Sequence, residues 1–176
     1  DIRATGLGDA STDRVHTDRV LQHVDGLAEA IGEVARVLRP GGRFVAAEPD
    51  WDTLVISGDL DVSRAYRSFV TEEVVRNAVV GRQLPRLLEE NGFEVAAVLP
   101  VTAVFRDLAS ADQVLGLGRV ATRAIRAGHL DAEAGDAWLT GHTEGAFFAS
   151  ATLFIVDAVR SPGDQSRVAG SATATV

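Results

Sequence analysis

A proline–glycine–glycine turn divides a helical pattern from an apolar strand pattern, and this junction constrains the fold more than any other part of the chain. Apolar residues recur at helical spacing over 27–38, which predicts an amphipathic helix. Pro40 ends such a helix, and Gly41 and Gly42 permit the positive φ angles of a tight helix-to-strand turn. The apolar run 44–47 is typical of a strand that is covered on both faces. Helix, turn and buried strand together indicate an α/β fold.

The rest of the chain continues this alternation of strand and helix. Val15 lies in a short strand pattern over 13–17, and Asp25 is the predicted N-cap of the helix that follows. Beyond residue 50, the apolar spacing predicts helices over 61–77 and 81–90 (with Pro85 in the first turn), a strand over 94–105, helices over 112–126 and 131–141, and a strand over 146–159. We therefore expect one α/β domain over 1–160, with two helices inserted between its last strands. The segment 161–176 is rich in Ser, Gly and Ala, and we expect a flexible tail there.

Composition describes an ordinary globular chain and excludes several kinds of chemistry. The 176 residues are 46% hydrophobic and carry a formal net charge of -8, which disfavours nucleic acid as a partner. The chain has no cysteine and no lysine, so it offers neither a thiolate metal site nor a lysine Schiff base. Its histidines show no metal-ligand spacing with nearby carboxylates, and we expect no metal site. No apolar run approaches the roughly 20 residues that span a bilayer, so we expect a cytoplasmic protein with no membrane partner.

Two linked segments carry a resemblance to a known family. Residues 18–24 leave a strand pattern, and residues 36–43 join the predicted helix to the next strand. This arrangement resembles the second half of a class I S-adenosylmethionine-dependent methyltransferase, of the broad family that modifies small molecules. The resemblance extends over about residues 6–159. It implies a Rossmann-like methyltransferase sheet, partly represented in this chain, in which the inserted helices shape the substrate pocket. The family's glycine-rich loop and its ribose-binding acidic residue have no counterpart in the sequence.

The resemblance implies that the cofactor, S-adenosylmethionine, contacts residues around the first strand. Asp9 and Ala10 would address the adenine ring, with the carboxylate accepting from the exocyclic amine. The backbone of Thr17 and Asp18 would hold the methionyl amino group, at the carboxyl end of a parallel strand, where open α/β sheets bind ligands. Arg19 would pair with the methionyl carboxylate or brace the loop; the alternative is a surface ion pair.

Three more side chains are candidates for the reaction and for the acceptor. His23 would lie near the sulfonium or the substrate, where it contributes to cofactor binding or acts as the catalytic general base. The alternative is that His23 only caps the following helix or forms a hydrogen bond to the end of the strand. Glu48 and Trp51 follow the next parallel strand, at the same sheet edge, and would line the acceptor pocket. In the alternative, Trp51 covers the sheet edge and touches no ligand.

These residues predict an S-adenosylmethionine-dependent methyltransferase that acts on a small-molecule acceptor, and we expect a homodimer through the inserted helices. The absent glycine-rich loop supports an alternative, a non-catalytic methyltransferase-like binding or dimerisation module. A nicotinamide-dependent Rossmann enzyme ranks third, because it needs a Gly-x-Gly-x-x-Gly loop that the sequence lacks. The chain has no methionine and opens in mid-pattern, so we expect it to be part of a longer product, with residues absent between Ala10 and Ser11.

Overall fold

A computed structural model describes residues 1–162, and residues 163–176, most of the predicted tail, lie outside the described residues. Strands and helices alternate along the chain, which confirms the predicted α/β class. The elements in chain order are β1 (Thr12–Asp18), the short 3-10 helix η1 (Leu21–His23), α1 (Leu27–Val37), β2 (Leu38–Ile56), α2 (Leu60–Phe69), the π-helical turn η2 (Val70–Val74), α3 (Val80–Glu90), β3 (Phe93–Phe105), α4 (Leu108–Leu115), α5 (Leu117–Arg126), α6 (Ala132–Glu144) and β4 (Ala149–Arg160).

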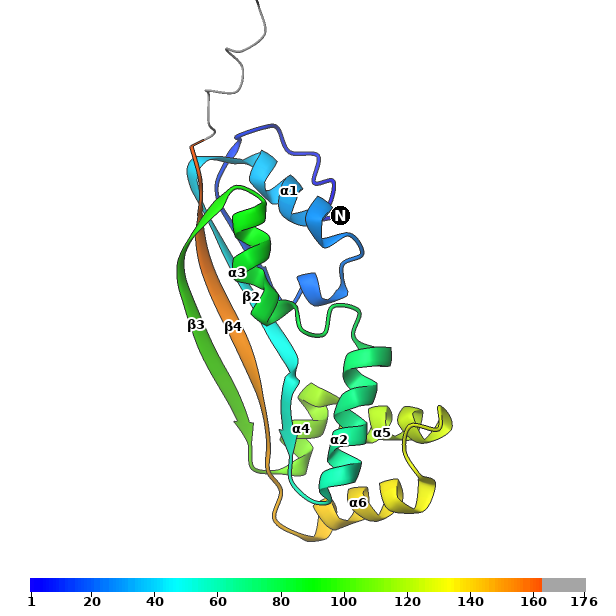
Figure 1. Ribbon diagram of the computed structural model, residues 1–176. Coiled ribbons are helices and arrows are strands. Elements are labelled where there is room, and N and C mark those ends of the chain that lie inside the picture. Colours follow the sequence, from blue (N-terminus) through cyan, green and yellow to red (C-terminus); the bar gives the residue numbers. More distant parts are fainter. Residues whose placement is uncertain (163–176) are drawn as a thin grey trace, which may run out of the picture.

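The four strands form one mixed sheet in the order β1-β2-β4-β3 (Figure 1). β1 and β2 are parallel, and β4 is antiparallel to both β2 and β3. The parallel pair needs a crossover connection, which α1 provides. α4, α5 and α6 connect β3 to β4, so the predicted helical insertion between the last two strands is confirmed. β2 has 19 residues and reaches from the α1 layer to the helices at the other end of the molecule.

α1 and α3 cover one end of the sheet (Figure 1). They pack on an apolar cluster to which the sheet contributes Phe44 and Val156 and α3 contributes Leu84, and all three side chains are fully buried. Ile31 and Val34 of α1 are buried in the same cluster, as the helical spacing predicts. This layer therefore fixes the amino-terminal half of β2 and, through it, the direction of β1.

Some predicted boundaries are wrong for local reasons. The N-cap of α1 is Gly26, at φ 78°, and not Asp25. Pro85 is the sixth residue of α3 and so lies beyond its first turn. The segment 112–126 is not one helix, because Gly116 at φ 66° ends α4 and begins α5.

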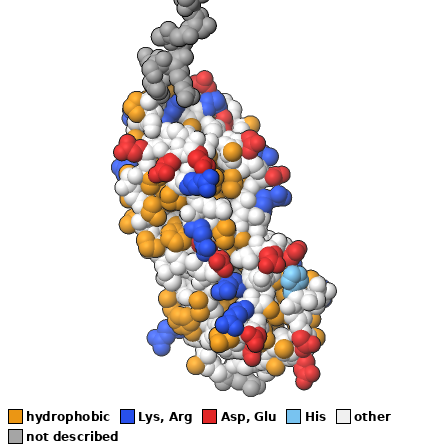
Figure 2. All heavy atoms as spheres, in the orientation of Figure 1, with side chains coloured by type: hydrophobic (Ala, Val, Ile, Leu, Met, Phe, Trp, Pro, Cys, Tyr) orange, Lys and Arg blue, Asp and Glu red, His pale blue; other side chains and the backbone are white. Residues whose placement is uncertain are grey.

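β3 leaves a row of apolar side chains exposed at the sheet margin. Val98, Leu99, Val101 and Val104 have exposed fractions between 41% and 56%. Figure 2 shows apolar side chains gathered along the side of the molecule where β3 lies. Over residues 1–162, no helix is both long enough and apolar enough to span a membrane.

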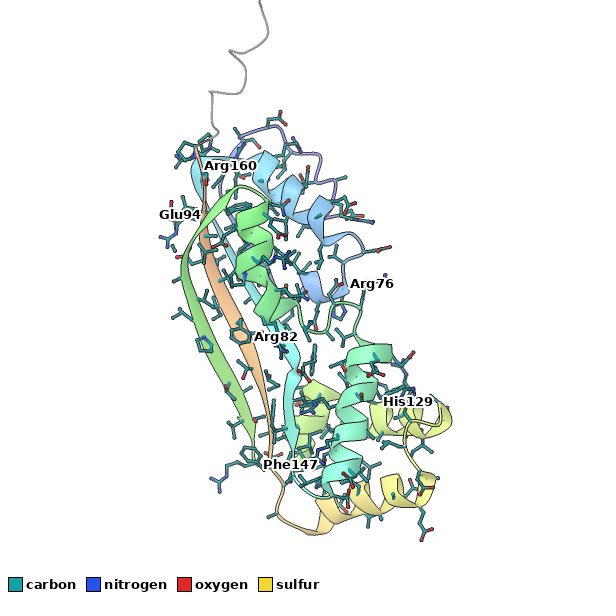
Figure 3. All side chains as sticks on the ribbon, in the orientation of Figure 1. Arg76, Arg82, Glu94, His129, Phe147 and Arg160 are labelled. Carbon is teal, nitrogen blue, oxygen red and sulfur yellow. The ribbon has the colours of Figure 1, made fainter. Side chains whose placement is uncertain are left out.

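The cap, which we define as α2, α4, α5 and α6, encloses a second apolar cluster around Tyr66 and Trp138 (Figure 1). His142 of α6 is buried in it between Trp138 and Phe147, whose ring centroids lie 4.6 and 5.2 Å away. Phe147 enters the cluster from the segment between α6 and β4 (Figure 3). The Nε2 atom of His142 has no hydrogen-bond partner among the described residues. Burial therefore lowers the pKa of His142.

Because His142 is buried, we expect the cap to lose stability at acidic pH. The folded-state pKa of His142 lies below the unfolded value of about 6.5, so protonation favours the unfolded chain. We expect neutral His142 to make its full contribution to the free energy of unfolding above that unfolded pKa. This contribution should fall as the pH drops below it. His142→Phe is expected to remove this part of the pH dependence. Thermal unfolding at about pH 7.5 and about pH 5 measures the effect on either side of the histidine range. The exposed His129→Phe is the control, and equal pH slopes for wild type and His142→Phe would refute the account.

Candidate functional site

A cavity of about 740 Å³ lies between the carboxyl ends of β1 and β2 and the cap. This volume is within the usual range for small-molecule sites, about 300–1,000 Å³. β1 and η1 contribute the polar part of its wall, and the other elements contribute mainly apolar and aromatic side chains. The lining residues are Asp18, Arg19, Gln22, His23, Pro49, Trp51, Leu54, Tyr66, Val70, Val74, Val75, Ala103, Phe105, Val114, Leu115, Arg119, Val120, Ala151, Thr152 and Leu153.

A buried carboxylate holds η1 at the edge of this cavity. Glu48 is fully buried in β2, and its carboxylate accepts hydrogen bonds from three successive backbone N–H groups, those of residues 20–22, at 2.9, 2.8 and 3.2 Å. N–H groups at the start of a helical turn have no partner inside the turn, and Glu48 supplies one. Burial raises the pKa of Glu48, and the three N–H donors offset part of that rise. Glu48 therefore fixes where η1 begins, next to the end of β1.

Two further side chains complete the support of η1. The Asn77 amide donates to the backbone carbonyls of Leu21 and Val24, both at 2.7 Å. The indole N–H of Trp51 donates to the Gln22 side-chain oxygen at 2.8 Å. η1 is thus bound at its start, at its end and on its side, which holds this part of the cavity wall in one conformation.

An irregular stretch of β2 turns side chains toward the cavity. The pairing of β2 with β4 shifts register between Asp50 and Val55, and such irregularities re-aim side chains. Trp51 and Leu54 lie within this stretch, and both line the cavity. Asp50 is buried at its start, where its carboxylate pairs with the Arg82 guanidinium of α3 (Figure 3). The ion pair therefore ties the irregular stretch to the α3 layer.

Arg19 turns the chain from β1 into η1. Its φ is 53°, in the left-handed region, where a non-glycine residue is strained by about 1–3 kcal/mol. Its backbone N–H donates to the Ala47 carbonyl at 2.8 Å, which holds the strained conformation. Its guanidinium pairs with Asp18 at 3.2 Å, and both side chains are about half exposed. Strained non-glycine residues are concentrated at functional sites. The strain at Arg19 therefore favours a functional role for the end of β1.

The structure brings four of the candidate residues into one cavity, namely Asp18, Arg19, His23 and Trp51. Glu48 is not among the lining residues. β2 continues well past residue 48, so Glu48 lies inside the strand and faces η1 instead of following the strand at its edge. Its role in the structure is to hold the residues that line the cavity.

Thr17 faces the other side of the sheet. It pairs with Ala46, which belongs to the cluster under α1 and α3, whereas the next residue, Asp18, lines the cavity. The Thr17 side chain is buried, and its Oγ1 has no hydrogen-bond partner among the described residues. A contact between Thr17 and a ligand in the cavity would therefore go through its backbone.

Asp9 and Ala10 lie at the opposite end of β1 from the cavity. No strand forms in the first ten residues, and β1 begins two residues after Ala10. Its seven residues, at roughly 3.3 Å each, separate the pair from the cavity. Asp9 pairs with Arg36 near the end of α1, and the Ala10 N–H donates to the Arg36 carbonyl at 2.9 Å. The link to β1 is too short to return the pair to the carboxyl end.

Sequence reasoning missed most residues of the wall, and three of these carry polar groups that bear on its chemistry. Gln22 joins η1 to Trp51, Tyr66 is a fully buried phenol of α2, and Arg119 enters from α5. Burial, with a smaller contribution from Asp112, raises the pKa of Tyr66, so its phenol stays neutral. The apolar spacing of α2 marks Tyr66 as buried but gives no sign of a cavity beside it. Among residues 1–162, no group of three or more His, Asp or Glu side chains is arranged to hold a metal ion.

Comparison with known proteins finds similarity to methyltransferases in sequence and in fold. A family model described as a methyltransferase domain matches residues 1–46. Over 95 residues the chain is 38% identical to a probable S-adenosylmethionine-dependent methyltransferase of Mycolicibacterium smegmatis, covering 54% of this chain and 34% of that protein. The fold is similar to that of a putative methyltransferase from Bacillus halodurans, with a TM-score of 0.59 at 15% identity, covering 92% of this chain and 70% of that one. These similarities support a class I methyltransferase fold for the chain, and the match to the family model lies in residues 1–46.

Two further similar proteins are longer than the part that this chain matches. YcgJ protein from Bacillus subtilis has a TM-score of 0.56 at 14% identity, covering 92% of this chain and 69% of that one. An uncharacterized 37.1 kDa protein in transposon TN4556 of Streptomyces fradiae is 54% identical over 163 residues, covering 92% of this chain and 47% of that protein. The chain thus spans about half the length of one curated relative and about a third of the other. The Rossmann-like sheet expected from the sequence is confirmed.

Proposed function

We propose that the cavity at the end of β1 is part of the active site of an S-adenosylmethionine-dependent methyltransferase that acts on a small-molecule acceptor. One observation carries the proposal. The strained Arg19 and the side chains of His23 and Trp51 line one cavity at the carboxyl end of a parallel strand pair. Open α/β sheets bind their ligands at that end.

The residues at this end suit the methionyl part of the cofactor. Asp18 and Arg19 form an exposed ion pair at 3.2 Å, and together they offer a carboxylate to an ammonium group and a guanidinium to a carboxylate. The face of Trp51 suits a sulfonium, because aromatic rings attract cations. Asp9 and Ala10 are left out of this proposal, because β1 separates them from the cavity.

The chemistry needs few side chains. When bound, S-adenosylmethionine supplies an electrophilic methyl group on a sulfonium sulfur. The apolar wall would exclude water and hold an acceptor oxygen, nitrogen or carbon in line with that methyl group. We assign to His23 the role of accepting the proton that the acceptor loses, because His23 lines the cavity beside Arg19 and a neutral imidazole nitrogen can accept a proton.

A tryptophan-specific binding experiment tests the proposal. The chain has two tryptophans, of which Trp51 lines the cavity and Trp138 lies in the cap cluster. S-adenosylhomocysteine is expected to change tryptophan fluorescence of the complete translated chain in a saturable way. Trp51→Phe should abolish that change, and the matched variant Trp138→Phe should keep it. A saturable signal that survives in Trp51→Phe, or no saturable signal in the wild type, would count against the proposal.

A further inference from the structure

Arg119 places a free cation in the wall of the cavity. It enters from α5, and no ion pair or hydrogen bond to its side chain is found within residues 1–162. On the preceding helix, α4, the Asp112 carboxylate accepts the Gly118 N–H at 2.8 Å. The Arg119 guanidinium therefore has all of its donors available to a ligand.

The charge of the cavity differs from the charge of the chain. Its charged lining residues are Asp18, Arg19 and Arg119. Asp18 and Arg19 neutralise each other, so Arg119 leaves the cavity with a net positive charge. The whole chain has a formal net charge of -8. A positive cavity attracts an anionic group locally, even though the chain as a whole is acidic.

The wall between Arg119 and η1 is apolar. It includes Trp51, Leu54 and Phe105 from the sheet and Tyr66 from α2. The buried Tyr66 phenol is neutral, because burial raises its pKa, and it adds no charge. A ligand that fills this space buries a hydrocarbon or aromatic body against the wall, at about 25 cal/mol per Å² of apolar surface removed from water.

We propose that the acceptor is an apolar molecule with one anionic group, a carboxylate or a phosphate, and that Arg119 binds this anionic group. The proposal rests on the proposed function, because it takes the His23 and Trp51 end of the cavity as the place where the methyl group is transferred. The apolar body of the acceptor then spans the wall between Trp51 and Arg119. Arg119 is a specificity residue in this account, since it selects the acceptor and takes no part in the transfer.

A matched pair of probes tests the role of Arg119. Pyrenebutyrate and pyrenebutanol share an apolar body and differ in carrying a carboxylate or a hydroxyl group. Their dissociation constants are measured by equilibrium dialysis on the complete translated chain with saturating S-adenosylhomocysteine. The carboxylate is expected to bind about tenfold tighter than the alcohol, as one charge-assisted hydrogen-bonded pair predicts. Arg119→Gln should reduce this ratio to about one. Arg119→Lys should keep part of it, and Arg126→Gln, an exposed position of the same helix outside the cavity wall, should leave it unchanged.

The outcomes separate this inference from the proposed function. Equal affinities for the two probes in the wild type, or an equal loss of the ratio in Arg119→Gln and Arg126→Gln, would overturn the inference. Calorimetric titration of the same preparations with S-adenosylhomocysteine reports the cofactor site independently. If S-adenosylhomocysteine binds and the probe ratio is one, the proposed function stands and the anionic acceptor is refuted. If S-adenosylhomocysteine does not bind, the proposed function fails, and with it the role of this cavity in methyl transfer.

Discussion

Replacing Glu48 with glutamine is expected to lower the free energy of unfolding by about 2 kcal/mol and to weaken S-adenosylhomocysteine binding at least about tenfold. The Glu48 carboxylate accepts three backbone N–H groups with two oxygens, whereas an amide has one acceptor oxygen and adds two donors. At least one N–H of η1 then loses its partner. Binding weakens because η1 carries His23 and adjoins Arg19, and both line the cavity.

Two effects oppose each other at this position, and their balance sets the expected size. Burial of the charged Glu48 carboxylate is unfavourable, as its raised pKa indicates, and glutamine removes that cost. The unpaired N–H groups cost about 1–3 kcal/mol each, so the loss is larger than the gain. Urea unfolding and calorimetry measure the two consequences. Glu90→Gln, an exposed partner of Arg86 on α3, is the matched control and should change stability by less than about 0.5 kcal/mol. Wild-type stability and affinity in Glu48→Gln would show that η1 does not depend on this carboxylate.

Gly81→Ala is expected to destabilise the fold by about 2–3 kcal/mol, because it overpacks the contact between α3 and β2. A Cβ atom on Gly81 would lie 2.7 Å from the Glu48 carbonyl oxygen and 3.0 Å from the Pro49 carbonyl group. Both neighbours are backbone atoms of a central strand, so the helix has to move instead. A shift of α3 would displace its own Leu84 and Leu88, which are fully buried.

Gly32→Ala is the matched control for this substitution. Gly32 is also inside a helix, α1, and an added Cβ would meet nothing within 4 Å. We expect Gly32→Ala to raise stability by about 0.5–1 kcal/mol, through the better helix propensity of alanine alone. The two substitutions should therefore have opposite signs in urea unfolding. A Gly81→Ala variant at least as stable as the wild type would contradict the close approach of α3 and β2.

The order and type of the elements were predictable because local spacing determines them. The apolar residues of α1, the turn at Gly41 and the alternation that follows indicate helix, turn and strand without knowledge of any partner. The boundaries of β2 were less predictable. Glu48 and Asp50 are acidic and read as the end of a strand, yet both are buried, because η1 and Arg82 satisfy their carboxylates. Those partners come from other elements, so the sequence pattern around β2 does not reveal them.

The candidate site was predictable only where it follows from strand topology. Asp18, Arg19 and His23 were placed at a carboxyl end because they follow a parallel strand, and the structure has them there. Asp9 was assigned to the same cofactor site only because of the resemblance to the family. The short connection to β1 keeps it at the other end of the strand. Arg119 reaches the cavity through the packing of α5 on α2, which depends on tertiary contacts between segments far apart in the sequence.

Calorimetric titration of the complete translated chain with S-adenosylmethionine shows whether the end of β1 belongs to a methyl-donor site. We predict saturable binding of one cofactor per chain, and binding should be weakened by Glu48→Gln and unaffected by Glu90→Gln. Absence of any binding heat at millimolar cofactor, or equal affinity in the wild type and Glu48→Gln, would contradict this prediction.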